Sequence, residues 1–220
     1  MGLFKINMVP FSVFFLFVLL SLSRGHAQRM LTEGRVEYAI SIDSVAGEDG
    51  LQTLFAGATQ VVWFKGNMVR VDFSSSLRNQ SLIFNSTTKT ALLLRESGSE
   101  KFMFKIDSSQ WVHFQLPFSG AVYKSFTQQE PCDGYYCQKV IATLPNGTNV
   151  EILYTPGIVP VTRSYDKMFE PINGLPVLYT RQVEGLKVHY KLISVQFLPV
   201  GSARFSVSGE GYKQIPYKAE

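Results

Sequence analysis

The stretch that most constrains the fold is residues 175–197, LPVLYTRQVEGLKVHYKLISVQF. On both sides of Glu184-Gly185, side chains alternate with a period of two, so each arm has one apolar and one more polar face. Alternation around a Gly-containing turn is the pattern of an antiparallel β-hairpin. The same pattern recurs along most of the chain, so we expect a protein built from hairpins rather than from helices.

Turn-forming residues separate the other alternating runs at short intervals. Gly66-Asn67 and Asn146-Gly147 are the strongest signals, because Gly and Asn accept the positive φ that tight hairpin turns require. About ten or eleven strands fit between such turns. We therefore predict a mainly β fold, a single curved antiparallel sheet or incomplete β-barrel, with one to three short helices as a lid.

Four segments depart from this alternation. Residues 51–55 are expected to hold a short helix, and residues 162–169 a helical turn that would cover the mouth of a barrel. Residues 108–126 are dense in aromatic side chains without a clean period, and they fit a lid, a short helix or an irregular loop. Residues 202–211, together with Ile215, are expected to close the chain as a last short strand.

The first 27 residues are expected to be a signal peptide rather than part of the fold. Residues 8–22 form an apolar run after a weakly positive start at Lys5, and small residues precede a cleavage site after Ala27. The run is about 15 residues long, shorter than the roughly 20 that span a bilayer, which disfavours an uncleaved anchor. We therefore expect an exported protein, periplasmic or extracellular, with residues 28–220 as a single β domain and no integral membrane span.

The charge balance argues against two classes of partner. The whole chain has 21 basic and 17 acidic residues. Removal of residues 1–27 takes away Lys5 and Arg24 and no acid, which leaves 19 basic and 17 acidic residues and a net charge of +2. This balance predicts neither a nucleic-acid-binding surface nor a polybasic patch for membranes.

Cys132 and Cys137 are the only cysteines in the chain. In an exported protein, an isolated pair five residues apart is expected to close a small disulfide loop. A redox-active pair would more often read Cys-x-x-Cys near a βαβ pattern, and a metal site would need further ligands. We therefore expect a structural disulfide and no metal site, with free thiols as the alternative.

No catalytic motif is present. His113 and His189 are the only histidines after residue 27, and no Ser or Cys lies in a Gly-x-Ser-x-Gly context. Phosphate-binding glycine loops and zinc-ligand spacings are also missing from the sequence. We therefore expect no catalytic residues, no cofactor and no enzyme activity.

Two kinds of side chain are candidates for a binding site. Arg70 and Arg181 each lie mid-strand between apolar neighbours, which fits an outward-facing residue or an edge gatekeeper. The alternative is an arginine at the mouth of an apolar cavity, paired with a lipid headgroup or carboxylate. The aromatic residues of 108–126 form either core or pocket wall. The candidate ligand-binding residues are Arg70, Arg181, Trp111, Phe114, Phe118 and Tyr123.

Several short motifs occur in a recognisable order. EGRVEY, VWFKGNMVRVD, GYYCQK, YTP and GLPVLY lie between residues 33 and 179, and GYK follows at 211–213. Together they resemble the exported DUF4412 and GLPGLI-like proteins of Bacteroidetes-type bacteria, which are similar to the lipoprotein carrier and receptor superfamily (LolA/LolB-like). The resemblance implies an incomplete antiparallel β-barrel around short helices, with an apolar concavity that receives acyl chains in the carriers.

The chain departs from that superfamily in two places. The carriers have an Arg-Pro turn in the second hairpin, where this chain has Lys65-Gly66-Asn67. The chain also lacks the lipid-anchoring cysteine of the receptor. The resemblance therefore implies neither the opening mechanism of the carriers nor the anchor of the receptor.

These observations predict an exported, non-enzymatic binding protein. It would hold an apolar ligand, a lipid or the acyl chain of a lipoprotein or acylated peptide, in a half-barrel at the bacterial envelope. The alternative is an envelope protein–protein interaction module with a packed sheet and no ligand cavity. The two differ in whether the concave face encloses a cavity of roughly 300 Å³ or more, the size expected for a small-molecule site.

Overall fold

The computed structural model describes residues 28–43, 55–183 and 186–217. The predicted signal peptide and most of the predicted helix at 51–55 lie outside the described residues. The strands, in chain order, are β1 (Arg29–Leu31), β2 (Glu33–Ile42), β3 (Thr59–Lys65), β4 (Met68–Ser74), β5 (Asn79–Asn85), β6 (Thr90–Ser97), β7 (Glu100–Ile106), β8 (Val122–Cys132), β9 (Tyr135–Thr143), β10 (Asn149–Thr155), β11 (Ile158–Pro160), β12 (Leu175–Val183), β13 (Leu186–Gln196) and β14 (Lys213–Gln214).

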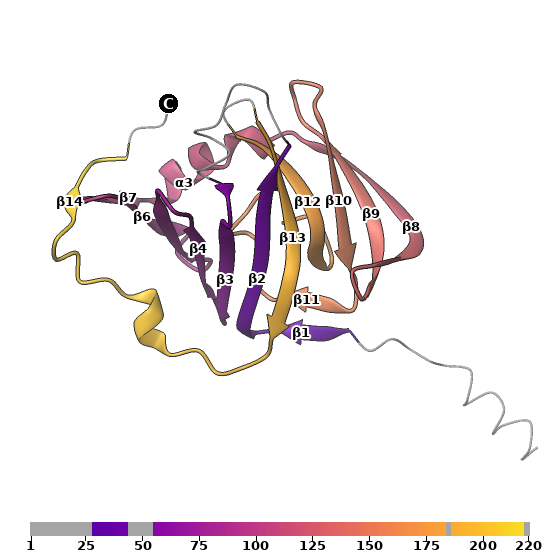
Figure 1. Ribbon diagram of the computed structural model, residues 1–220, viewed down its shortest axis with the longest axis horizontal. Helices are drawn as coiled ribbons and strands as arrows, with labels where there is room; N and C mark the ends of the chain where they lie inside the picture. Colours follow the sequence, from indigo (N-terminus) through magenta and orange to yellow (C-terminus); the bar gives the residue numbers. More distant parts are fainter. Residues whose placement is uncertain (1–27, 44–54, 184–185, 218–220) are drawn as a thin grey trace, which may run out of the picture.

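Twelve of these strands form one sheet, in the order β14-β7-β6-β5-β4-β3-β2-β13-β12-β10-β9-β8. All neighbours are antiparallel except β14 and β7, which are parallel. The sheet curves but does not close, so β8 and β14 remain at opposite edges (Figure 1). Strands β1 and β11 pair separately, in parallel. The predicted mainly β fold with one open, curved antiparallel sheet is confirmed.

The turn residues explain why the hairpins form where they do. Gly66 has a φ of 56° and lies directly between β3 and β4, and Gly147 has a φ of 82° between β9 and β10. Both angles lie in the left-handed region that glycine enters without steric cost. The organising hairpin is also present, since β12 pairs with β13 from Leu178–Lys191 to Val183–Leu186. The turn residues Glu184-Gly185 lie outside the described chain.

The alternating side chains place one continuous core on the concave face of the sheet. Val36, Tyr38 and Ile40 of β2 are buried there, as are the inward residues of the strands on both sides. Residues 161–174, here called the cover segment, add Met168, Phe169 and other apolar side chains to the same core. A single sheet therefore buries its inner face against chain that crosses it rather than against a second sheet.

The helical part of that covering follows β7. Helix α3 (Ser108–Phe114) begins with a capping box, in which the Asp107 carboxylate accepts from the backbone N–H of Ser109 and Gln110 and the Gln110 side chain accepts from Asp107 N–H. The 3₁₀ helix η1 (Leu116–Phe118) continues the chain toward β8. We call residues 107–121 the helical lid. They connect the β7 side of the sheet with its far edge.

Three expectations about the less regular segments need correction. Residues 162–169 form hydrogen-bonded turns, such as Phe169 N–H to Asp166 C=O at 3.0 Å, and no helix. Residues 122–126 begin strand β8 instead of continuing a lid. The last strand is short: β14 has two residues, and 202–205 form the 3₁₀ helix η2 (Ser202–Phe205). Positive φ angles at Gly209 and Gly211 are incompatible with the longer strand that we expected.

The C-terminal segment, residues 197–217, runs along the outside of the sheet from the end of β13 to β14 (Figure 1). It contacts the convex face through Arg204, whose guanidinium lies 3.7 Å from the centroid of the Trp63 ring. Lys213 near its end pairs with Glu100 at 2.7 Å. Within the described chain, no helix is both long enough and apolar enough to cross a membrane.

Candidate functional site

The concave face holds a cavity of about 730 Å³, partly open to solvent, between the inner side of the sheet, the helical lid and the cover segment. This volume is within the range of about 300–1,000 Å³ that is typical of ligand pockets. Most of the lining side chains are apolar. They include Val71, Phe73 and Leu82 of the sheet and Phe114, Leu116 and Phe118 of the helical lid.

Arg181 points into this cavity from β12. It lies opposite Val188, next to the inward-facing pair Tyr179–Tyr190. Its guanidinium forms an ion pair with the Asp166 carboxylate of the cover segment and lies 5.4 Å from the centroid of the Phe118 ring. Burial is the largest single effect and lowers the pKa of Arg181, but Asp166 together with Tyr179 and Tyr190 raises that pKa overall. Arg181 is therefore charged, and Asp166 neutralises it within the protein.

Tyrosines surround this pair on the sheet side. The rings of Tyr179 and Tyr190 stack at 4.5 Å, and Tyr38 meets Tyr179 edge-on at 5.6 Å. Burial raises the pKa of each of these hydroxyls above its ordinary value. Tyr38 donates to the Pro176 carbonyl at 3.0 Å, and Tyr179 accepts from Gln60 at 3.1 Å. The hydroxyls are thus neutral groups that fix the wall in place.

The predicted aromatic residues of the helical lid divide into core and wall. Trp111 is 5% exposed and lies between Phe84 and Phe114, with ring centroids 4.4 Å and 5.3 Å away. Phe114 and Phe118 line the cavity, whereas Trp111 lies behind them in the core. Of this aromatic cluster, Trp111 is therefore part of the core, whereas Phe114 and Phe118 form pocket wall.

Gln115 joins the helical lid to the cover segment. Its side-chain oxygen accepts from Lys167 N–H at 2.7 Å, and its side-chain nitrogen donates to the Tyr165 carbonyl at 3.3 Å. Tyr123, another predicted site residue, makes a similar link from β8, since its hydroxyl donates to the Met168 carbonyl at 3.3 Å. Tyr123 therefore holds the cover segment and does not line the cavity.

Arg70 does not line the concave cavity and lies instead at a smaller cavity of about 300 Å³ on the convex face. Its neighbours Val69 and Val71 face the core, and the period of two turns Arg70 to the convex face. There its Nε donates to Asp72 at 2.7 Å, and its Nη2 donates to Ser81 Oγ at 3.1 Å. The predicted arginines are thus separated by the sheet.

Arg78 lines the cavity and was missed in the sequence. It lies in the turn between β4 and β5, and its guanidinium lies 5.9 Å from the centroid of the Phe73 ring. Its Nε is buried and has no hydrogen-bond acceptor among the described residues. A polar turn has no alternation that would indicate where its side chains point, so no sequence signal marked this residue.

The predicted disulfide is not formed, and both cysteines are free thiols. Cys132 lies opposite Tyr135 in the β8–β9 hairpin, and Cys137 lies opposite Glu130. The cysteines are therefore diagonal neighbours across the hairpin. Burial raises the pKa of the Cys137 thiol to about 12, which keeps the thiol protonated.

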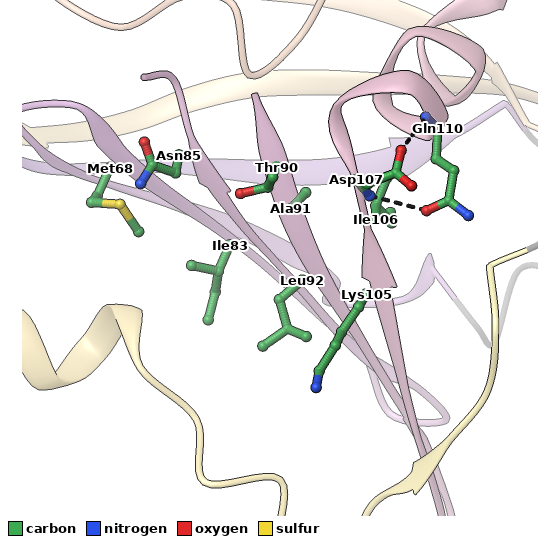
Figure 2. Close-up of a pocket in the computed structure, with 10 residues that line it drawn as sticks. All are labelled: Met68, Ile83, Asn85, Thr90, Ala91, Leu92, Lys105, Ile106, Asp107 and Gln110. Atoms are coloured by element: carbon green, nitrogen blue, oxygen red, sulfur yellow. Dashed lines mark hydrogen bonds between the residues drawn. The ribbon is translucent and has the colours of Figure 1, made fainter. Parts of the chain in front are cut away.

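A second cavity, of about 550 Å³, lies on the convex face near the start of α3. Figure 2 shows Ile83, Leu92 and Lys105 projecting to the same side of strands β5, β6 and β7, with the Asp107–Gln110 hydrogen bonds at one end. None of the predicted site residues lines it. Among the described residues, no three His, Cys, Asp or Glu side chains gather in a way that could hold a metal ion.

No family model matches the chain, and no curated protein matches it either. Several solved structures do match. One is PNGF-II, at a TM-score of 0.48 and 10% identity, covering 84% of this chain and 31% of that chain. Another is MucB, at a TM-score of 0.41 and 11% identity, covering 84% and 61%. A third is a β-barrel-like protein of domain family DUF1849 from Brucella abortus, at a TM-score of 0.40 and 8% identity, covering 78% and 100%.

This chain spans about a third of the length of PNGF-II. At these identities, and at TM-scores below 0.5, the likenesses carry no conclusion about the function of this chain. What the site can do has to be argued from its own geometry.

Proposed function

We propose that the chain is an exported, non-enzymatic binding protein that holds an apolar ligand, such as a lipid or an acylated peptide, at the bacterial envelope. The observation that carries the proposal is the cavity of about 730 Å³ on the concave face, with its largely apolar wall. Burial of apolar ligand surface in such a wall contributes about 25 cal/mol per Å². The resemblance of the sequence motifs to the DUF4412, GLPGLI-like and LolA/LolB-like proteins agrees with it.

The polar groups of the cavity favour binding over catalysis. Among the described lining residues there is no His, Cys, Ser or Lys. The one lining carboxylate, Asp166, is paired with Arg181, and the lining tyrosine hydroxyls of Tyr165 and Tyr190 have pKa values raised by burial. A nucleophile next to a general base, the minimum for covalent hydrolytic chemistry, is thus missing from this wall.

The size of the cavity also bears on the alternative, an interaction module with a packed sheet. A sheet whose inner face is filled by its own side chains leaves few voids larger than a water molecule. The cavity exceeds that by more than an order of magnitude, which favours the ligand-binding proposal. The packed-sheet alternative is therefore an outcome of the test below.

The test has two parts. Native mass spectrometry of protein purified from its host, followed by solvent extraction, should show a co-purified lipid or acylated species at close to one per chain. Uptake of a hydrophobic fluorophore should saturate at the same ratio. A clean apo mass together with no fluorophore uptake would contradict the proposal.

A pair of variants from the helical lid makes the second part specific. Leu116 and Val112 are both exposed, but Leu116 lines the cavity and Val112 does not. Leu116→Glu places a charge in the apolar wall and should weaken fluorophore binding at least tenfold, because an apolar ligand seated there would strip water from the carboxylate. Val112→Glu adds the same charge outside the cavity and should leave binding unchanged.

A further inference from the structure

The two arginines of the concave cavity differ in whether a carboxylate of the described chain pairs with them. Arg181 is paired with Asp166. Arg78 forms no ion pair with any carboxylate in the part of the chain that the structure describes. It is half-buried in the β4–β5 turn and faces the same cavity. Among the described residues, the cavity therefore has one positive charge without a carboxylate partner.

Arg78 also has an unmet donor. Its Nε is buried and finds no acceptor in the described part of the chain, whereas the Nε of Arg95 donates to the side-chain oxygen of Gln80 at 3.2 Å. Gln80 also lines the cavity, and its side-chain oxygen accepts from Arg95 rather than from Arg78. A buried donor without a partner is unfavourable, and most such groups in native proteins are satisfied by protein, water or ligand.

The geometry suits one class of acceptor. A guanidinium presents its N–H donors in a planar fork, which matches the two oxygens of a carboxylate or phosphate. The Phe73 ring, with its centroid 5.9 Å from the guanidinium, lies in the apolar wall beside it. An amphiphile with its chain along that wall would bring a terminal oxyanion to Arg78.

We propose that Arg78 binds the anionic headgroup of the ligand, so that the cavity selects acyl-chain amphiphiles that end in an oxyanion over neutral ones of the same length. This inference rests on the proposed function, since it needs an apolar chain in the cavity. The inference specifies the chemical class of the headgroup, an oxyanion, and the residue that binds it, Arg78. Arg181 contributes little to the selection, because Asp166 already neutralises it.

The test compares ligands that share a chain and differ in headgroup. Hexadecanoate, hexadecyl phosphate and hexadecanol are titrated at pH 8 below their aggregation concentrations, by displacement of a bound fluorophore. A hydrogen-bonded charge pair predicts about ten- to hundredfold tighter binding of the anionic ligands. The ratio between carboxylate and phosphate identifies which oxyanion source is preferred. Equal affinities for hexadecanoate, hexadecyl phosphate and hexadecanol would overturn the inference and leave the proposed function standing.

Variants test whether the preference for anionic ligands depends on Arg78. Arg78→Gln should bind both anionic ligands as weakly as hexadecanol and leave hexadecanol binding unchanged. Arg78→Lys keeps the charge without the planar fork of donors and should retain part of the preference. The control is Arg204→Gln, which removes one positive charge from the convex face, where Arg204 stacks on Trp63.

Each outcome has a distinct meaning. Full anion preference in Arg78→Gln, or the same loss in Arg204→Gln, would contradict the role of Arg78, because overall charge rather than the residue would then explain selection. Failure of all three ligands to bind the folded wild-type chain would overturn the proposed function, and the inference with it. Circular dichroism and urea unfolding confirm that each variant is folded.

Discussion

The two faces of the sheet carry the same kind of ion pair in different surroundings. Arg181 on the concave face pairs with Asp166, and Arg70 on the convex face pairs with Asp72. The two arginine side chains have nearly equal exposed fractions, 23% and 22%. What they are exposed to differs, because Arg181 faces a cavity lined with aromatic rings, whereas Arg70 lies on the outside of the sheet.

The difference follows from what covers each face. The helical lid and the cover segment cross the concave face and join its inward side chains into one apolar core. On the convex face, the C-terminal segment contributes contacts such as Arg204 on Trp63. Alternation therefore places side chains on both faces equally, and the crossing segments determine which face has the larger cavity.

The largest expected effect is on the free energy of unfolding, and it differs between the buried and the exposed side of α3. Trp111→Ala should lower the free energy of unfolding by about 4 kcal/mol, because it removes a buried ring stacked between Phe84 and Phe114. Val112→Ala, on the exposed side of the same helix, should change it by less than about 0.5 kcal/mol. Urea unfolding measures both, and similar values for the two would show that the helical lid is not part of the core.

The second prediction compares the two ion pairs directly. Asp166→Asn leaves Arg181 charged in the cavity and should lower the free energy of unfolding by about 3 kcal/mol. Asp72→Asn should lower it by about 1 kcal/mol, because Arg70 still donates to Ser81 and to the Arg204 carbonyl on the outside. The measurement is urea unfolding at neutral pH. Equal losses would mean that the concave pair is as well solvated as the convex one.

The sequence predicts much of the sheet and little of its covering. Gly66 and Gly147 mark hairpin turns through their backbone requirements, and the alternation around Arg181 correctly predicts that it shares a face with Tyr179. Strand β8 was missed, because at an edge its residues are mostly exposed on both faces and show no alternation. Local alternation therefore predicts strands that have a neighbour on both sides, and it misses β8, which is paired on one side only.

The site depends on contacts that have no local signal. Asp166 lies in a segment without a period, so its pairing with Arg181 becomes visible only once the cover segment crosses the sheet. The orientation of Arg70 depends on which of its strand's two faces is concave, and that choice belongs to the whole sheet. Arg78 is in a polar turn, where no alternation predicts that its side chain lines the cavity.

The third prediction compares the core with a smaller apolar cluster on the convex face. Met103 is 3% exposed on that face and lies 3.3 Å from the position that a side-chain β-carbon on Gly209 would occupy. Met103→Ala should lower the free energy of unfolding by about 2 kcal/mol, the lower end for such truncations, because the C-terminal segment can settle into the space. Met30→Ala, at an exposed methionine, should change it by less than about 0.5 kcal/mol. If Met103→Ala lowered the free energy of unfolding as much as Trp111→Ala does, the convex cluster would be as important for stability as the concave core.

The smallest effect concerns the link between β8 and the cover segment. Burial, followed by the charges of Asp166 and Glu170, raises the pKa of Tyr123 to about 12 in the folded protein, above the ordinary value of about 10 in an unfolded chain. The raised pKa means that the folded state favours the protonated hydroxyl. The resulting stabilisation is complete below about pH 10 and is lost as the pH rises toward about 12.

Urea midpoints at pH 8, 9, 10 and 11 should therefore decline more steeply for the wild type than for Tyr123→Phe. The variant cannot ionise at this position, although it loses the hydrogen bond to the Met168 carbonyl and starts from a lower midpoint. The buried concave-face tyrosines shift in the same direction, so the decline should become shallower without vanishing. Identical slopes in the two proteins would mean that Tyr123 ionises as freely in the folded protein as in the unfolded chain. The cover segment would then be less tightly held to β8 than the hydrogen bond implies.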